Sequence, residues 1–339
     1  MKYRSLIVRK HGGPEVLDVV ENELRPPKKG EVRIHVLAAS VCRPDVTVRR
    51  GEALYSGTLL GQKLPFTPGY SVIGEVDAVG KGVTQVQPGD RVGALTVTGG
   101  YTEVLYWRAN RLIPVPAALD PVQAVPLILN YIVAYQAMHR KAQVKAGDKA
   151  LIIGASGGIG TALLQLGQLA GLDMYAIASK DKHAILTEYG ATPIDYRSQD
   201  FAEIIRHSEP GGLDVVLDGM MRLEMMRKAL SLLQRGGRMV SFGEPASLAE
   251  LYRILGLTLR TNLPGSGKSL SLYGTSSYFL FDKKPYLEDW ATLFRLLGEG
   301  KINPVIAARF PILQATAANA LLESGQVTGN VVLVAPEWL

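Results

Sequence analysis

The sequence predicts an α/β protein in which a parallel sheet with helices on both faces follows a β-rich first third of the chain. Three observations carry this prediction. A strand pattern, a glycine-rich turn and a helix pattern follow one another at residues 150–165. Strand and helix patterns then alternate as far as residue 242, which is typical of a parallel sheet covered by helices. The first third of the chain has short strand patterns separated by turn signals instead.

Taken in order, the elements support this division of the chain. Residues 31–37 and 71–79 alternate apolar and polar side chains, and proline and glycine turns separate them. Helical periodicity dominates at 124–139, and it returns at 287–297. Buried strands are expected at residues 150–153, 174–177, 214–217 and 238–242, and a last strand is expected at 330–334.

The glycine-rich turn is the most informative segment. The apolar run 151–153 leads into Ala155-Ser-Gly-Gly-Ile-Gly160, and a helix pattern continues from Thr161. Glycines permit a sharp turn and the approach of a pyrophosphate, and the helix N-terminus supplies partial positive charge. Ordinary turn or cap glycines are the alternative, because Ala155 replaces the first glycine of the strict pattern. The turn predicts a dinucleotide site formed by Ala155, Ser156, Gly157, Gly158 and Ile159.

The end of the second strand indicates which dinucleotide binds. An acidic residue there would bind the ribose 2′-hydroxyl of NAD, but this chain reads Ala178-Ser-Lys-Asp-Lys182. A hydroxyl and two ammonium groups suit a 2′-phosphate, so the sequence favours NADPH, with Ser179 and Lys182 as ligands. A solvated helix start with Ser179 as its N-cap is the alternative interpretation, and both can hold together.

Composition limits the other function classes. The net charge of +6 over 339 residues is scattered, so nucleic-acid binding is not indicated. No segment approaches the roughly 20 apolar residues of a membrane span, and no secretory signal is visible. The single cysteine, Cys42, excludes an internal disulfide and a multi-cysteine metal site. We expect a cytoplasmic protein.

Several separated motifs together resemble the medium-chain dehydrogenase/reductase superfamily, and in particular its zinc-independent quinone oxidoreductases and enone reductases. The resemblance runs essentially from end to end. Besides the glycine turn, it rests on residues 65–76, 86–92, 195–197, 235–243 and 300–306. It implies a GroES-like catalytic domain at 1–123 and 265–339, with a Rossmann-like NADPH-binding domain at 124–264. It also implies an active site in the cleft between the domains, and a homodimer.

The resemblance also bears on metal binding. Zinc-dependent members carry Gly-His-Glu where this chain has Gly69-Tyr70-Ser71. Catalytic zinc normally needs three protein ligands, and only Cys42 and Asp45 lie in the corresponding region. We therefore expect no metal site. Without a Lewis acid, hydride addition to a quinone or an α,β-unsaturated carbonyl is a better prediction than alcohol oxidation.

Three residues are predicted to be catalytic by the same resemblance. Tyr55 follows Arg49-Arg50-Gly51, about two residues later than the tyrosine of related enzymes, and a packing role is the alternative. Cys42 replaces an asparagine of many relatives, and it is either a small packed side chain or a reactive thiol. Asp45 is expected to orient the site or to cap a helix that begins at Val46.

The remaining cofactor residues also come from the resemblance, and packing is the alternative for most of them. Tyr196 is similar to a tyrosine at the adenine end of NADPH, and Lys182 to a lysine at its 2′-phosphate. The other assigned residues are Asn130 beneath the cofactor, Phe242 and Gly243 beside the nicotinamide, and Asn330 in the last strand. The sequence thus predicts an NADPH-dependent reductase. A zinc alcohol dehydrogenase and a non-catalytic NADPH-binding interaction protein are the alternatives.

Overall fold

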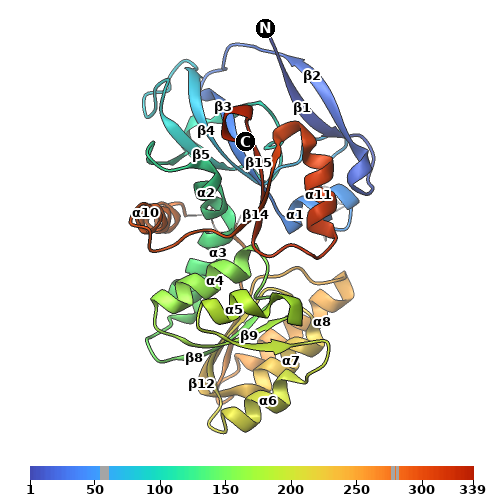
Figure 1. The fold of residues 1–339 in the computed structure, drawn as a ribbon, viewed down its shortest axis with the longest axis vertical. Coiled ribbons are helices and arrows are strands. Elements are labelled where there is room, and N and C mark those ends of the chain that lie inside the picture. Colours follow the sequence, from blue (N-terminus) through green and yellow to red (C-terminus); the bar gives the residue numbers. More distant parts are fainter. Residues whose placement is uncertain (54–60, 276–278, 280–281) are drawn as a thin grey trace. The chain divides into compact units, whose positions relative to one another are not determined.

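The computed structural model of the chain describes residues 1–53, 61–275, 279 and 282–339. It divides into two compact units (Figure 1). The β-rich unit consists of Met1–Leu129 and Phe279–Leu339, and the parallel-sheet unit consists of Asn130–Tyr278. Among the described residues, no helix is long and apolar enough to cross a bilayer.

The β-rich unit holds a seven-stranded sheet and a separate two-stranded sheet. The large sheet has the order β14-β15-β3-β4-β5-β7, and β6 pairs with β3. All of its pairs are antiparallel except β14 with β15. The strands are β1 Lys2–Val8, β2 Leu17–Glu23, β3 Glu31–Val41, β4 Ser71–Val79, β5 Arg91–Leu95, β6 Val104–Arg108, β7 Ile113–Pro114, β14 Ile306–Pro311 and β15 Asn330–Val334.

Apolar side chains of these strands and helices form one core, which includes Leu6, Ile34, Val72, Tyr101 and Leu333. The two-stranded sheet, β1 with β2, contributes to the same core through Leu6. The helices of this unit are α1 Arg43–Arg50, α2 Pro121–Pro126, α10 Lys284–Gly298 and α11 Ala315–Glu323.

The parallel-sheet unit has six strands in the order β10-β9-β8-β11-β12-β13, all parallel. The chain runs outward from β8 in one direction and then returns to run outward from β11 in the other. Ligands bind at such a reversal, outside the carboxyl ends of the strands. The strands are β8 Lys149–Ile153, β9 Asp173–Ala178, β10 Thr192–Asp195, β11 Leu213–Asp218, β12 Leu233–Ser241 and β13 Ser269–Leu272.

Helices cover this sheet, and α6, α7 and α8 lie side by side (Figure 1). Side chains such as Leu151, Val216, Met226 and Ile254 fill the core between helices and sheet. The helices are α3 Ile132–Tyr135, α4 Gly158–Leu169, α5 His183–Glu188, α6 Phe201–Ser208, α7 Leu223–Leu232 and α8 Leu248–Thr261. The α/β class with a Rossmann-like parallel sheet and a GroES-like part is therefore confirmed.

Two elements differ from the sequence-based expectation. The helix predicted at 124–139 is interrupted. Helix α2 is followed by the π-helical segment Leu127–Tyr131, and α3 is followed by the π-helical segment Gln136–Ala142. The strand predicted at 238–242 is β12, which begins at Leu233 and ends at Ser241. Its interior contains Gly236 at φ +87°, beside a register irregularity opposite β11. A glycine with positive φ thus extends the strand where the sequence pattern indicated a break.

Candidate functional site

The glycine turn joins the carboxyl end of β8 to the N-terminus of α4. Gly154 has φ +82°, a conformation that favours glycine, and Gly157 is the N-cap of α4. The Ala155 N–H donates to the Ile177 carbonyl at 3.2 Å, which ties the turn to the end of β9. The first turn of a helix has N–H groups without intrahelical acceptors and carries positive partial charge. The turn therefore presents groups suited to an anion.

Two glycines of the turn have opposite surroundings. A Cβ atom on Gly160 would lie 2.3 Å from the Gly154 oxygen and 2.4 Å from the Ala155 oxygen. A Cβ atom on Gly157 would meet only the Gly154 oxygen, at 3.8 Å. Gly160 thus lets the helix pack directly on the turn, whereas Gly157 leaves open space beside the backbone. That space is what a pyrophosphate needs to approach the N–H groups.

A second group of predicted residues gathers at the carboxyl ends of β9 and β10. The parallel register pairs Ala178 with Asp195, so Ser179 and Tyr196 follow two adjacent strand ends. Ser179 is buried, while the Tyr196 side chain is 52% exposed. Lys182 is half-buried and ends the short 3-10 turn that Ser179 precedes. The fold therefore brings Ser179, Lys182 and Tyr196 to one corner of the sheet.

Charged side chains surround this corner. The Ser179 side chain makes no N-cap hydrogen bond but bonds the Asp181 carboxylate, and this bond, with the charges of Lys182 and Arg197, lowers the pKa of Asp181. The Arg197 guanidinium lies 5.7 Å from the centroid of the Tyr196 ring. Sequence reasoning missed Arg197, although it directly follows Tyr196. The corner thus brings the Ser179 hydroxyl and the cations of Lys182 and Arg197 together with the carboxylates of Asp181 and Asp195.

A buried carboxylate shapes the loop after β11, beside the reversal of strand order. Asp218 accepts hydrogen bonds from the Ser241 hydroxyl at 2.7 Å, from the Met220 N–H at 2.9 Å and from the Met221 N–H at 3.2 Å. Burial raises its pKa. Met221 adopts φ +51°, which is uncommon for a residue other than glycine. Asp218 therefore holds a strained loop in place, and no motif in the sequence identified it.

The same loop packs closely on the end of β12. The Phe242 N–H donates to the Asp218 carbonyl at 2.9 Å. A Cβ atom on Gly243 would lie 2.7 Å from the Gly219 oxygen, so only glycine fits there without a shift. Met220 is 43% exposed and extends toward the glycine turn, where a Cβ atom on Gly154 would lie 3.6 Å from its sulfur. Phe242, Gly243 and Met220 therefore lie at the same edge as the glycine turn.

Asn130 is the first residue of the parallel-sheet unit and lies, half-buried, in a π-helical segment. Such segments are frequent at functional sites. Asn330, in contrast, lies in the β-rich unit as the first residue of β15. Its side-chain N–H donates to the Val305 carbonyl at 3.0 Å, and it is buried. Tyr55, the third predicted catalytic residue, lies outside the described residues.

Cys42 and Asp45 form a buried polar cluster at the start of α1. Helix α1 begins at Arg43, with Cys42 as its N-cap, and not at Val46 as the sequence suggested. Asp45 is therefore the third residue of the helix and not its N-cap. The Asp45 carboxylate accepts the Cys42 N–H at 2.8 Å, the Tyr101 hydroxyl at 3.1 Å and the Gly69 N–H at 3.2 Å. It therefore ties α1 to the Gly69-Tyr70 turn and to Tyr101.

Burial governs the titration of this cluster. It raises the pKa of Asp45 to about 7, although hydrogen bonds from Cys42, Tyr101, Gly69 and Tyr70 act in the opposite direction. Burial and the neighbouring Asp45 also raise the pKa of the Cys42 thiol well above its usual range. A high pKa disfavours the thiolate, which is the form that acts as a nucleophile or binds a metal.

These residues supply too few ligands for a catalytic zinc ion. Such a site normally needs three protein ligands, and with Tyr70 at the place of the family's histidine only Cys42 and Asp45 remain in this region. In the part of the chain that the structure describes, no three His, Cys, Asp or Glu side chains form a group that could hold a metal.

Comparison with known proteins agrees with this architecture. Residues 28–117 match the family model of the alcohol dehydrogenase GroES-like domain, and residues 189–333 match that of the zinc-binding dehydrogenases. Quinone oxidoreductase from Rattus norvegicus is 30% identical over 337 residues, covering 98% of this chain and 97% of its own. The chain belongs to the medium-chain dehydrogenase/reductase superfamily, in its quinone oxidoreductase-like group.

Two further relatives extend the comparison. The Escherichia coli quinone oxidoreductase, solved in complex with NADPH, superposes with a TM-score of 0.84 at 27% identity, covering 98% of this chain and 99% of that one. A mycocerosic acid synthase-like polyketide synthase of Mycobacterium tuberculosis is 30% identical over 334 residues. The match covers 98% of this chain but only 15% of the length of that protein. The chain is thus an oxidoreductase of this superfamily with a nicotinamide-cofactor fold.

Proposed function

We propose that this family member transfers hydride from NADPH to a quinone or an α,β-unsaturated carbonyl without a zinc ion. One observation carries the zinc-free part of the proposal. At the position of the family's zinc ligands, the Asp45 carboxylate is engaged by three donors and the Cys42 thiol is buried. An alcohol oxidation would lack a Lewis acid there, whereas an activated acceptor does not need one.

The preference for NADPH rests on the corner formed by β9 and β10. A 2′-phosphate is a dianionic acceptor that suits the Ser179 hydroxyl and the cations of Lys182 and Arg197. Tyr196, more than half exposed, offers an aromatic face for the adenine. The Asp181 carboxylate would have to turn away from the same groups when the phosphate binds. With NADH it could instead accept the 2′-hydroxyl, so the strength of the preference depends on Asp181.

The rest of the cofactor site is proposed along the sheet edge. The pyrophosphate would lie on the N–H groups of residues 155–159, where Gly157 leaves space. Phe242 and Gly243 would border the nicotinamide, with Asn130 beneath the cofactor. When bound, the reduced nicotinamide supplies the hydride. We place this site in the parallel-sheet unit, Asn130–Tyr278, and the catalytic part in the β-rich unit, Met1–Leu129 and Phe279–Leu339.

The catalytic demand on the protein is modest under this proposal. As hydride adds to the acceptor, negative charge develops on its carbonyl oxygen, and a positioned donor stabilises that charge. Tyr55 is the proposed donor. Asp45 would act as a positioning residue, because it fixes the Gly69-Tyr70 turn and the start of α1 through its hydrogen bonds.

The decisive experiment mixes the protein with NADPH or NADH and follows the loss of reduced-cofactor absorbance over a panel of quinones, enals and enones. Turnover with at least one acceptor, faster with NADPH, is the expected result. Tight NADPH binding without turnover of any acceptor would instead favour a non-catalytic NADPH-binding protein. The buried thiol of Cys42, which stands where many relatives have an asparagine amide, is the feature that supports this alternative. One tightly bound zinc per chain, with alcohol oxidation, would favour the zinc dehydrogenase alternative.

We further propose a cytoplasmic homodimer. The chain has a single cysteine, which is buried, so its fold depends on no internal disulfide that a reducing compartment would break. Sedimentation of the purified protein at micromolar concentration gives the oligomeric state directly.

A further inference from the structure

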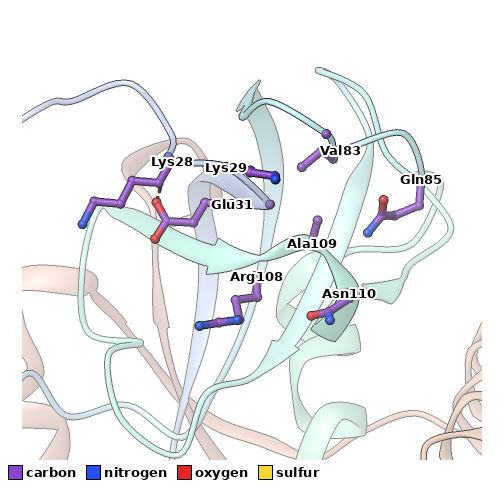
Figure 2. Close-up of a pocket in the computed structure, with 10 residues that line it drawn as sticks. Lys28, Lys29, Glu31, Val83, Gln85, Arg108, Ala109 and Asn110 are labelled. Atoms are coloured by element: carbon purple, nitrogen blue, oxygen red, sulfur yellow. Dashed lines mark hydrogen bonds between the residues drawn. The ribbon is translucent and has the colours of Figure 1, made fainter.

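A pocket in the β-rich unit is separate in its lining from the proposed cofactor and catalytic residues. It has a volume of about 520 Å³ and is formed by three segments, residues 28–31, 82–85 and 108–110 (Figure 2). Backbone hydrogen bonds hold these segments together, because the Ala109 N–H donates to the Gly30 carbonyl at 3.0 Å and the Gly30 N–H donates to the Lys81 carbonyl at 3.0 Å. We call it the basic pocket, since cationic side chains line it.

The charge of the basic pocket is mainly positive. Lys28, Lys29 and Arg108 are exposed in its lining, and within the described residues none of them forms an ion pair. Glu31 also lines the pocket, but its carboxylate is occupied by the Arg25 guanidinium at 2.8 Å and by the Lys28 backbone N–H at 2.9 Å, and these bonds lower the pKa of Glu31. Three cations are thus available to an anion beside a carboxylate that has its own partner.

A second pocket, of about 340 Å³, adjoins the basic pocket. The two pockets share Gln85, Ala109 and Asn110 in their linings. The other side chains of the second pocket are apolar, and they include Val86, Leu112, Pro114, Leu287, Trp290 and Ala291. We call it the apolar pocket.

Helix α10 forms one wall of the apolar pocket through Leu287 and Trp290. Lys283, directly before this helix, donates from its Nζ to the Asn110 carbonyl at 2.7 Å, which ties α10 to the wall that both pockets share. The Trp290 indole N–H donates to the Leu127 carbonyl at 3.1 Å and fixes the ring. Specific hydrogen bonds therefore hold the walls of the apolar pocket in place.

Cationic and apolar surfaces lie at different ends of this pair of pockets. Figure 2 shows Lys28 and Glu31 at one end of the basic pocket, Gln85 and Asn110 at the other, and Arg108 between them. Gln85 and Asn110 are also the residues that border the apolar pocket. A ligand that fills both pockets therefore meets cations at one end and apolar side chains beyond the two amides.

We propose that the two pockets together bind a single-chain amphiphile, with a phosphate or carboxylate head in the basic pocket and an unbranched alkyl chain in the apolar pocket. Cations bind such heads through charge-assisted hydrogen bonds, and an alkyl chain gains free energy by leaving water. Ligand sites typically combine an apolar lining with a few polar groups that fix orientation. The proposal does not rest on the proposed reductase activity, because every residue that lines the two pockets belongs to the β-rich unit.

The first test is isothermal titration of the full chain with decyl phosphate below its critical micelle concentration. Excess NADPH is present throughout, so that the proposed dinucleotide site is not available to the phosphate. One molecule per chain is expected to bind, and each methylene added between hexyl and decyl phosphate should tighten binding about two- to fourfold. Inorganic phosphate and decyltrimethylammonium should bind at least about tenfold more weakly. Equal affinity for either of them, or no binding of decyl phosphate, would overturn the proposal.

The head is tested with Arg108→Gln. Loss of this cation should weaken decyl phosphate about tenfold and leave the weaker binding of decanol unchanged, because decanol carries no charge. Arg111→Gln is the matched control, since Arg111 is an exposed arginine in the 3-10 turn that begins at Ala109 but lines neither pocket. Equal weakening in both variants would show only a general effect of surface charge and would contradict the assignment.

The tail is tested with Leu287→Gln, a change at a side chain that is 39% exposed, so the fold should be retained. The gain in affinity with alkyl chain length should shrink, whereas the affinity for inorganic phosphate should stay the same. Leu169→Gln, the same change at an exposed leucine of α4, is the control and should keep the full dependence on chain length. An unaltered dependence in Leu287→Gln would place the alkyl chain elsewhere.

Two further results would also contradict the proposal. Flotation with vesicles of phosphatidylcholine and phosphatidylserine that depends on Arg108, without binding of monomeric decyl phosphate, would identify a membrane surface as the ligand. Displacement of decyl phosphate by NADPH would place the phosphate at the dinucleotide site. Turnover of a quinone or enone without decyl phosphate binding refutes only the amphiphile site, and binding without turnover of any acceptor refutes only the proposed reaction.

Discussion

The sites of the two units differ in how far their polar groups are open to a ligand. In the parallel-sheet unit, Gly157 is exposed, Tyr196 is 52% exposed and Lys182 is half-buried at the sheet edge, although Ser179 is buried. In the β-rich unit, Asp45 and Tyr101 are buried and bonded to each other. Open groups are available to a ligand, whereas buried groups are occupied by the fold. A change in the first should therefore alter binding, and a change in the second should alter stability first.

The largest expected effect is that of Asp45→Ala. The change leaves the Cys42 N–H, the Gly69 N–H and the Tyr101 hydroxyl without their acceptor inside the protein. Each unsatisfied buried donor costs about 1–3 kcal/mol, so we expect unfolding in urea to require about 4 kcal/mol less free energy. Asp181→Ala, the same change at an exposed carboxylate, should stay within about 0.5 kcal/mol. Similar losses in both variants would remove the distinction between the units.

Titration of Asp45 should give the next largest effect. Its pKa in the fold is about 7 against an ordinary value of 3.8, so the folded protein holds the proton more tightly than the unfolded chain. Stability contributed by this group is therefore lost as the pH rises from about 4 through about 7, and the loss is nearly complete by about pH 8. Between pH 5 and 8, the unfolding free energy of the unaltered protein should fall by on the order of 2–3 kcal/mol relative to Asp45→Asn. Parallel pH curves would contradict this.

The two turn glycines sharpen the comparison within the parallel-sheet unit. Gly160→Ala puts a Cβ atom 2.3 Å from a carbonyl oxygen, so it should cost about 2 kcal/mol of stability and also disrupt NADPH binding. In Gly157→Ala the new methyl group lies in open space, so the stability of the fold should not change. The same methyl group would block the approach of a phosphate to the N–H groups of the turn. Urea unfolding and fluorescence titration with NADPH separate the two outcomes. An unchanged NADPH affinity in Gly157→Ala would place the pyrophosphate elsewhere.

Lys182→Ala should affect only the cofactor that carries the 2′-phosphate. Loss of a charge-assisted contact is expected to weaken NADPH about tenfold or more and to leave NADH nearly unchanged. Lys180→Ala removes an equal charge from the neighbouring exposed lysine and serves as the control. Equal weakening of NADPH and NADH in Lys182→Ala would mean that the lysine does not meet the phosphate.

The smallest expected effect is that of Asp181→Asn. The carboxylate competes with the phosphate for Ser179 and the nearby cations, so its removal should tighten NADPH a few-fold. NADH, which would lose an acceptor for its 2′-hydroxyl, should weaken slightly. Isothermal titration with both cofactors measures the two changes, and movement in the same direction would exclude competition.

The sequence by itself determined the features that are contiguous along the chain. A strand, a glycine turn and a helix N-terminus lie within about a dozen residues, so their spacing predicts both the βα unit and its anion-binding geometry. The strand end at Ser179 is local in the same way. The alternation of strand and helix patterns likewise fixed the fold class, because βαβ units repeat along the chain.

Only the tertiary structure decided which carboxylates are buried and what they hold. Asp45 meets Gly69 and Tyr101 across 24 and 56 residues, and Asp218 meets Ser241 across 23, separations that carry no local signal. Helical spacing of apolar residues predicts that one face of a helix needs a partner, but which element provides that partner depends on how all the other elements pack.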